Sequence, residues 1–254
     1  MENVTLAKNF DQYFEIKFAN TKELREESYR IRHSVYCEEL GWEPLQENGL
    51  ESDECDEYSF ALLLLHKRTG QYAGTARLVI TPPHSPDKKL PFEKHCLDTL
   101  RRDRVNMADY PQGSYSEISR LAVPESFRRR AGEKNTPFVV NDVSLDADVF
   151  SADERRNFPN IAIGLYLSII ALAEMCSHLA MFVVVEPRLS RRLNRIGFLF
   201  EQAGDEHDYH GNRALFYLPR EKFTSNLNPE ILELYYLLEQ QLKQQMFLLP
   251  YLIR

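Results

Sequence analysis

The most apolar stretch of the chain, residues 161–185, limits the possible folds more than any other feature. Its first part, Ile161 to Leu179, is apolar almost all round, as expected of a helix packed against a sheet. Its second part, Met181 to Glu186, is short and rich in valine, which predicts a strand. Polar residues interrupt the stretch at Glu174, Cys176, Ser177 and His178. A buried helix followed by a strand explains this pattern better than a membrane span, so the sequence predicts an α/β protein.

The composition is typical of a globular protein. With 254 residues and 43% hydrophobic content, the chain can bury one large core or two small ones, and we expect a single domain over residues 1–254. A formal net charge of −7 argues against overall electrostatic binding of nucleic acid. The four cysteines are scattered and form no C-x-x-C pair, so neither a metal site nor a disulfide framework is expected. The first 17 residues show no secretory pattern, which predicts a cytoplasmic protein.

Strand and helix patterns alternate along the chain. Residues 13–19 alternate apolar and polar side chains and predict a strand. Asn20 and Glu23 are spaced like a capping box at the start of a helix, which should end at Gly41. The further expected elements are a hairpin of residues 60–66 and 74–81, a central strand 115–123, an acidic surface insertion at about 133–159, a basic helix 187–196, closing strands 198–200 and 214–218, and a C-terminal helix at about 228–254.

Charged and aromatic residues recur in four short pieces of the first half of the chain. The pieces read R-H-S-V-Y-C-E-E-L-G-W at 32–42, E-S-D-E-C-D at 51–56, G-T-A-R-L at 74–78 and S-E-I-S-R-L-A-V at 116–123. Together they resemble the acyl-homoserine-lactone (autoinducer) synthases and the long-chain N-acyl amino acid synthases, which belong to the GNAT acyltransferase superfamily. The acyltransferases associated with bacterial exosortase systems are also similar. The resemblance covers about residues 12–220, and the agreement of several pieces in order makes it more specific than any single motif.

This resemblance implies a GNAT-like α/β fold with a central mixed, mostly antiparallel sheet flanked by helices. In that fold the strands that correspond to residues 115–123 and 181–186 splay apart and leave backbone groups free to bind a pantetheine chain. The acyl thioester would then lie beside residues 117–123, in contact with Leu121, Ala122 and Val123. No tightly bound cofactor is implied.

Glu117 is the candidate catalytic base, because an amine must lose a proton before it attacks a thioester. On a regular strand its side chain shares a face with Ser119, whereas Arg120 points to the other face unless a bulge redirects it. The alternative is a structural ion pair between Glu117 and an arginine of another strand, such as Arg77. We keep both interpretations, with Arg120 as a second candidate catalytic residue.

A polar network is the expected role of the other charged residues in these pieces. By resemblance, the network shapes the pocket for the amine substrate, and one of its arginines can bind the carboxylate of an amino acid. The alternative is a purely structural set of mutually satisfied charges. The residues are Arg32, Asp53, Asp56, Arg77 and Arg120.

Tyr36 and Trp42 are the aromatic candidates for substrate binding. Trp42, the only tryptophan, matches a position that lines the acceptor pocket in the resembling family, although a single aromatic residue is more often part of a core. Tyr36 stands where the autoinducer synthases usually carry phenylalanine. The added hydroxyl argues against the homoserine-lactone substrate.

The donor is expected to be an acyl carrier protein rather than coenzyme A. Arg128, Arg129 and Gly132 follow the central strand where GNAT acetyltransferases carry a pyrophosphate-binding loop. Here the loop pattern is incomplete, because Glu133 and Lys134 follow Gly132. A carrier protein presents only one phosphate on its pantetheine arm. It can dock on the basic helix, although those cations are equally explained by a solvated helix face. They are Arg188, Arg191, Arg192 and Arg195.

The sequence therefore predicts an enzyme that transfers a fatty acyl group from an acyl carrier protein to the amine of an amino acid or a derivative. The alternatives are an acyl-homoserine-lactone synthase that uses S-adenosylmethionine, a non-catalytic sensor of acyl ligands, and an acetyltransferase that uses coenzyme A. The C-terminal helix is expected to pack on the core or a second subunit, with a cover for a long acyl chain as the alternative.

Overall fold

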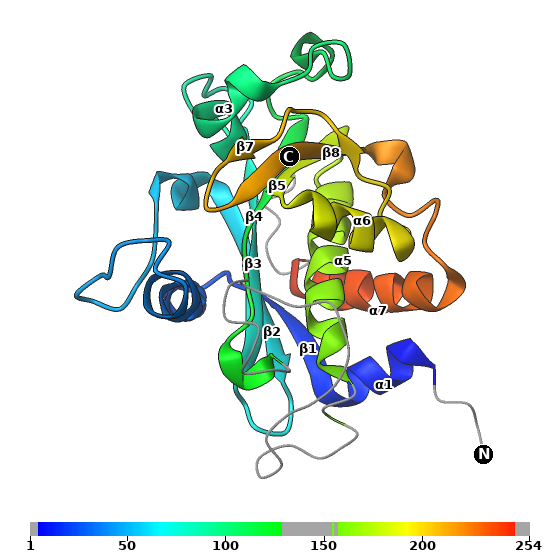
Figure 1. Ribbon diagram of the computed structural model, residues 1–254. Coiled ribbons are helices and arrows are strands. Elements are labelled where there is room, and N and C mark those ends of the chain that lie inside the picture. The colour runs from blue at the N-terminus through cyan, green and yellow to red at the C-terminus, as the bar shows by residue number, and fades with distance from the viewer. Residues whose placement is uncertain (1–4, 129–153, 155–156, 247–254) are drawn as a thin grey trace.

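A single twisted sheet organises the computed structural model, which describes residues 5–128, 154 and 157–246 (Figure 1). The eight strands found in this part of the chain run in the order β1-β2-β3-β4-β5-β8-β6, and β7 pairs with β8. Their bounds are β1 Phe14–Phe18, β2 Ser59–His66, β3 Tyr72–Ile80, β4 Tyr115–Ala122, β5 Ala180–Val185, β6 Glu201–Gln202, β7 His207–Asp208 and β8 Asn212–Pro219. Only β4 and β5 are parallel. The predicted mixed, mostly antiparallel sheet is confirmed.

Helices cover both faces of this sheet. The helix α5 packs on β2, β3 and β4, and α7 packs against α5, α1 and β1 on the same side, whereas α2 lies on the opposite face (Figure 1). The longer helices are α1 Leu6–Tyr13, α2 Lys22–Arg32, α3 Pro91–His95, α5 Pro159–Met175, α6 Pro187–Arg195 and α7 Pro229–Met246. The short turns are η1 His33–Glu39, η2 Glu54–Tyr58, η3 Leu97–Thr99, η4 Met107–Asp109, η5 Glu125–Phe127 and η6 Arg220–Lys222. No helix in the described ranges combines the length and hydropathy needed to cross a bilayer.

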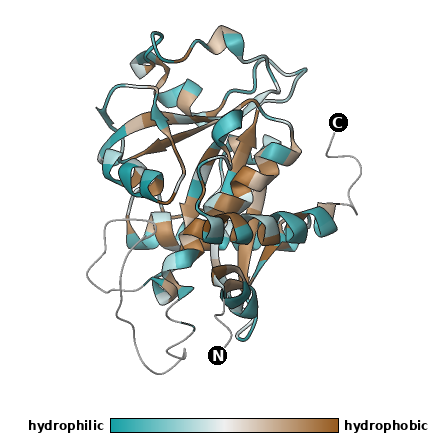
Figure 2. Ribbon diagram, turned by 90° about the vertical axis from the view of Figure 1, so that its right-hand side faces the viewer, coloured by the Kyte–Doolittle hydropathy of each residue, from teal (hydrophilic) through white to brown (hydrophobic). Residues whose placement is uncertain are grey.

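The core lies between the sheet and the α5–α7 layer (Figure 2). Every residue of α5 from Ile161 to Ala173 is buried, which explains why this helix is apolar all round. Gly164 allows α5 to approach α1, since a Cβ there would lie 2.6 Å from the Phe10 ring. The helix α7 buries Ile231, Leu234, Tyr235, Leu238 and Leu242 in the same core, as expected for packing on the domain.

The strands β4 and β5 separate partway along their length. Their ladder joins residues 115–118 to residues 180–183 and stops there, although β4 continues to Ala122 and β5 to Val185. In the same region, the register between β3 and β4 shifts between Thr75 and Arg77. Arg120 forms this bulge with a φ of 50°. The predicted splay of the central strands is therefore present.

Two local predictions differ from the structure, and a third agrees with it. The side chain of Thr21, rather than Asn20, caps α2, and it accepts a hydrogen bond from the Leu24 N–H group. The strand expected at residues 198–200 lies at Glu201–Gln202 instead. Gly41 does end the first helical segment, with a φ of 62°, after the π-helical turn η1. The sequence pattern alone could not decide which of several neighbouring residues caps the helix or begins the strand.

Most of the predicted acidic insertion lies outside the described residues, but its C-terminal end is buried. Glu154 forms an ion pair with Arg68 and lies 3.3 Å from His66 Nε2. Phe158 packs at ring-centroid distances of 6.5 Å from Phe14 and 5.3 Å from Phe127. The surface segment therefore ends before Glu154. Sequence alone could not distinguish this ion-paired carboxylate from the acidic residues near it in the chain. Residues 247–254, the end of the predicted C-terminal helix, also lie outside the described ranges.

Candidate active site

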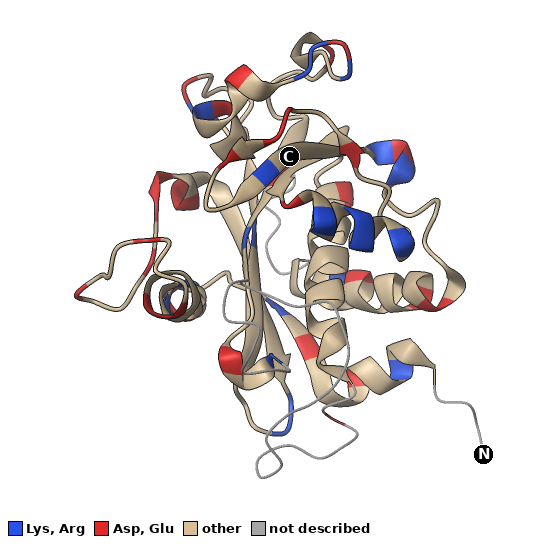
Figure 3. Cartoon of the chain, in the orientation of Figure 1, with Lys and Arg blue, Asp and Glu red and all other residues tan. Residues whose placement is uncertain are grey.

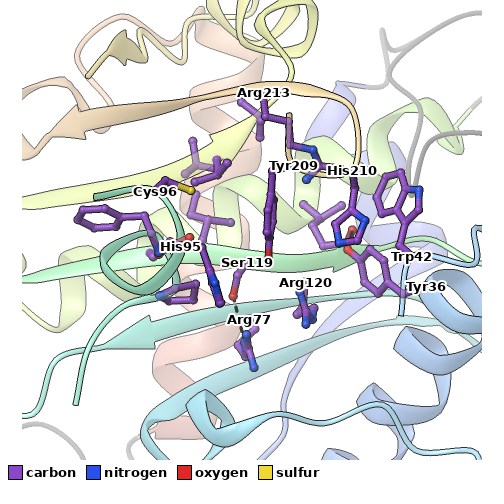
Figure 4. Close-up of a pocket in the computed structure, with 18 of the residues that line it drawn as sticks. Tyr36, Trp42, Arg77, His95, Cys96, Ser119, Arg120, Tyr209, His210 and Arg213 are labelled. Carbon is purple, nitrogen blue, oxygen red and sulfur yellow. Dashed lines mark hydrogen bonds between the residues drawn. The ribbon is translucent and has the colours of Figure 1, made fainter. Parts of the chain in front are cut away.

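A cavity of about 720 Å³ opens where β4 and β5 separate (Figure 4). Its walls come from the exposed edges of both strands, from the segment around Tyr36 and Trp42, and from the turn between β7 and β8. The apolar part of the wall includes Ile118, Leu121, Tyr166, Val183, Val185 and Leu189. The cavity thus combines unpaired strand edges with an apolar lining and, on one side, a group of charged residues.

Glu117 lies in the wall of this cavity with only 3% of its surface exposed. Its carboxylate accepts a hydrogen bond of 2.8 Å from the Phe92 N–H group. Burial raises the pKa of the Glu117 carboxyl to about 8, although the Phe92 hydrogen bond and the charge of Arg77 oppose this shift. The alternative ion pair with Arg77 is not formed, and no other basic side chain of the described residues pairs with Glu117. A carboxyl with this pKa can exchange a proton with an amine near neutral pH.

Arg77 is buried on β3 with all parts of its guanidinium group occupied. Its two terminal nitrogens donate to Asp53 Oδ1 and Oδ2 at 2.7 and 3.0 Å, and Nη1 also lies 2.9 Å from Asp56 Oδ1. Nε donates to Ser119 Oγ at 3.0 Å, which fixes the hydroxyl beside Glu117 on β4. Burial alone would raise the pKa of Asp53, but the Arg77 guanidinium holds it well below its usual range. Asp53 is therefore ionised.

Arg32 is fully buried at the end of α2, behind the cavity wall. Its terminal nitrogens donate to Asp56 at 2.7 and 3.0 Å, and its Nε donates to Glu51. Asp56 and Asp53 also cap the turn η2 reciprocally. Arg32 and Asp56 do not line the cavity, so they position the residues that do.

Arg120 enters the cavity because of the bulge in β4 (Figure 4). Its guanidinium donates to Glu43 at 2.9 Å and to Glu51 at 3.1 Å, and it lies 3.4 Å from Asp53. Three arginines and four carboxylates thus form one continuous network with a formal charge of −1. The structure brings together all five residues predicted for it. Sequence analysis missed Glu43 and Glu51, although Glu51 opens the quoted piece at 51–56.

Tyr36 and Trp42 form an aromatic wall beside the network. Tyr36 donates a hydrogen bond of 2.7 Å from its hydroxyl to the Leu121 carbonyl, and burial raises its pKa to about 12. The ring of Trp42 lies 6.0 Å from that of Tyr36 and lines the cavity, so Trp42 is not an ordinary core residue. The Tyr36 hydroxyl is used within the protein and holds η1 against the unpaired end of β4.

The turn between β7 and β8 supplies a second wall that sequence analysis did not identify (Figure 4). Tyr209 points toward Ser119, and His210 stacks on Trp42 at a ring distance of 5.5 Å. The Arg213 guanidinium lies 4.8 Å from the Trp42 ring. Gly211, with a φ of 102°, makes this turn possible. Gly211 could have indicated a turn, but nothing in the sequence shows that this turn lies opposite the motifs of the first half of the chain.

The residues predicted to bind the acyl donor lie in different environments, and only one of those described lines the cavity. Leu121 lines the cavity, Ala122 pairs with Thr75, and Val123 is buried in the main core. Arg128 is buried and forms an ion pair with Glu39 instead of lining the cavity. Arg129 and Gly132 lie outside the described residues.

The basic helix α6 begins at the mouth of the cavity. Arg188 and Arg192 line the mouth, and all four α6 arginines are exposed to solvent. Figure 3 shows the basic positions along α6 in blue. None of them forms an ion pair with another described residue. No group of His, Cys, Asp and Glu side chains in the described ranges has the arrangement of a metal site. The mouth of the cavity is thus cationic on the side of α6, whereas both signs of charge occur within.

The fold and the cavity define a GNAT-type acyltransferase domain. Residues 31–136 match the family model described as "Acetyltransferase (GNAT) domain". No curated protein matches the sequence. This part of the chain therefore matches a GNAT acyltransferase domain, and solved structures extend the comparison to the fold of most of the chain.

Acyl-homoserine-lactone and N-acyl amino acid synthases share this fold. TofI, crystallised with an inhibitor and MTA, is 15% identical with a TM-score of 0.57, covering 86% of this chain and 99% of TofI. BjaI, a CoA-dependent acyl-homoserine lactone synthase solved with SAM and isopentyl-CoA, is 19% identical with a TM-score of 0.53, covering 88% and 87%. FeeM, an N-acyl amino acid synthase from uncultured soil microbes, is 12% identical with a TM-score of 0.53, covering 84% and 94%. At these identities the likeness shows the fold.

Proposed function

We propose that the protein transfers a fatty acyl group from an acyl carrier protein to the amine of an amino acid or a close derivative, as a cytoplasmic enzyme. The observation that carries the proposal is Glu117, a buried carboxyl without a cationic partner among the described residues, at the point where β4 and β5 separate. FeeM, an N-acyl amino acid synthase, supplies a precedent for this reaction on the same fold.

The reaction follows from the geometry of the cavity. The pantetheine amides would bond to the unpaired backbone groups of β4 and β5, which places the thioester beside Glu117. Glu117 takes a proton from the ammonium group of the acceptor, and the free amine attacks the thioester carbonyl carbon. The C–S bond then breaks, an amide forms, and the pantetheine thiol leaves with a proton. Arg77 and Arg120 keep the charges around the amine in place.

A carrier protein fits the donor site better than coenzyme A. Arg128 is neutralised by Glu39 and does not reach the cavity, so this side chain is not free to bind a pyrophosphate. The exposed arginines of α6 surround the mouth, where an acidic carrier would dock. BjaI is described as CoA-dependent, so both donors belong in the test.

The test is an assay of the purified protein with acyl carrier protein and coenzyme A thioesters of different chain lengths. Pooled amino acids, homoserine lactone and S-adenosylmethionine serve as acceptors, and mass spectrometry identifies the products. We expect N-acyl amino acids from the carrier-bound donor, and a loss of product in Glu117→Gln. An acyl-homoserine lactone formed only with S-adenosylmethionine would show the alternative synthase. Bound acyl ligand without turnover would show a sensor.

A further inference from the structure

Arg213 differs from Arg77 and Arg120 because its guanidinium is not paired with a carboxylate of the described residues, and from Arg188 and Arg192 because it is partly buried. No hydrogen bond or ion pair within the described part of the chain involves its side chain, and its Nε atom is shielded from solvent. The guanidinium lies 4.8 Å from the Trp42 ring, in the wall of the cavity. A partly buried guanidinium that lines a cavity and pairs with no described carboxylate can bind an anion there.

Trp42 stabilises this arrangement only in part. A cation over an indole face is attracted by the ring, but the ring offers no hydrogen-bond acceptors to the five N–H groups of an arginine. Burial lowers the pKa of Arg213 by more than Tyr36, Glu186 and Tyr209 together raise it, so these neighbours offset its charge only in part. A carboxylate would supply both the missing charge and two acceptor oxygens in the matching planar geometry.

The opposite wall of the cavity favours the other end of an amino acid. There Glu117 carries a buried carboxyl without a cationic partner among the described residues, and Glu43 and Asp53 of the network line the cavity beside it. The fork of Arg77 is already used by Asp53, Asp56 and Ser119, so it cannot also hold a substrate carboxylate. Figure 4 shows Arg213 on one side of the group and Ser119 and Arg120 on the other, with Tyr209 between them. The cation of Arg213 therefore lies on one side of the cavity, and the carboxyl groups lie on the other.

We propose that Arg213 binds the carboxylate of a free amino acid acceptor against the Trp42 ring, and so directs the amine toward Glu117. The inference rests on the proposed function and deepens it, because it assigns the acceptor a free carboxylate. Arg213 then acts as a specificity-determining residue. An amino acid carboxamide or a lactone would enter the same cavity without this contact.

The first experiment compares an amino acid that the protein acylates with its carboxamide, in the wild type and in Arg213→Gln. We expect the variant to raise the KM for the amino acid by about tenfold or more, since charge-assisted hydrogen bonds are lost. The KM for the carboxamide should change less than about twofold, and kcat should stay similar for both. Arg25→Gln, which removes an exposed arginine from α2, is the matched control. Equal effects on both acceptors, or none, would overturn the inference.

The second experiment does not need turnover. Trp42 is the only tryptophan, so its fluorescence reports directly on a ligand that binds Arg213 beside it. Titration with the amino acid should change the emission of the wild type, whereas Arg213→Gln should bind at least about tenfold more weakly at an unchanged melting temperature. If wild type forms no N-acyl product but this difference persists, the proposed function fails and the carboxylate site stands. With S-adenosylmethionine as acceptor, a lactone product that depends on Arg213 would identify S-adenosylmethionine as the ligand whose carboxylate Arg213 binds. No difference between the two proteins would refute the carboxylate site.

Discussion

Arg77 and Arg213 both face the same cavity, yet they are held in opposite ways. Arg77 is saturated by two carboxylates and a hydroxyl, whereas Arg213 lies over the Trp42 ring and forms no hydrogen bond or ion pair with another described residue. Burial would lower the pKa of both groups, but Asp56 and Asp53 raise that of Arg77 above its usual range, while that of Arg213 stays lowered. We interpret the paired Arg77 as a structural part of the site and the unpaired Arg213 as a group that binds a ligand.

The same division applies to the acidic residues. Asp53 and Asp56 are compensated by arginines and stay ionised, whereas Glu117 has no cationic partner in the described ranges and favours its neutral form. Compensated groups should affect stability when they are removed. Uncompensated groups at the cavity should affect chemistry or binding instead, and the predictions below test this difference.

Removing a compensated charge should have the largest effect. Arg77→Met leaves Asp53 without its main partner and Asp56 with Arg32 alone, in a largely buried place, which should lower the free energy of unfolding by about 3–5 kcal/mol and abolish activity. Urea denaturation followed by circular dichroism measures this loss. A stability within about 1 kcal/mol of wild type would break the distinction, because it would show that the network does not support the fold.

Removing an uncompensated acid should act on catalysis alone. Glu117→Gln keeps an oxygen that can accept the Phe92 N–H group but cannot take a proton from the amine. We expect kcat to fall by about 10²- to 10⁴-fold, with a melting temperature equal to or above that of wild type. Steady-state kinetics and thermal denaturation give the two values. A variant that keeps its kcat would exclude Glu117 as the base.

The raised pKa of Glu117 predicts a specific pH dependence. The base is the ionised form, so activity should rise as the pH increases and level off above about 8, with about a tenfold gain from pH 7 to the plateau. Because the folded protein favours the neutral carboxyl, this group stabilises the fold below its unfolded pKa and loses that effect as the pH rises toward 8. A kcat/KM profile without this limb, at pH values where the protein is stable, would contradict the assignment.

The smallest effect should come from the exposed cations of α6. Arg191→Glu together with Arg195→Glu changes charges that lie next to the mouth but do not line the cavity. The KM for a carrier-bound donor should increase by a few-fold, about 3- to 10-fold, and more at low salt, since the contribution is electrostatic steering. The KM for the same acyl group on free pantetheine is the control. Equal changes for both donors would remove the docking role.

Sequence patterns located the parts of the fold that depend on local order. The apolar helix α5, the strand β5 and the hairpin β2–β3 follow from periodicity and turn residues. The network was also expected from the motifs, and β4 does contain the bulge that a cavity-facing Arg120 requires. These features are encoded by residues close together in sequence or by an arrangement shared with similar enzymes.

The second wall of the cavity could not be located in this way. Arg213 and His210 contact Trp42 across a separation of about 170 residues, and such a contact depends on how the whole sheet closes. Glu154 is similar, because its pairing with Arg68 distinguishes it from acidic neighbours only after folding. Long-range pairs of common residue types leave no local pattern to detect.

The extra residue at Arg120 makes this part of the chain sensitive to length. Two residues of β4, Arg120 and Leu121, occupy the space opposite a single residue of β3, so the alternation of the strand restarts after the bulge. A deletion of one residue there would exchange the inward and outward positions that follow, from Leu121 to Val123. Such a site can tolerate substitutions, but the insertion or deletion of one residue between Ser119 and Ala122 would alter the cavity and the core at once.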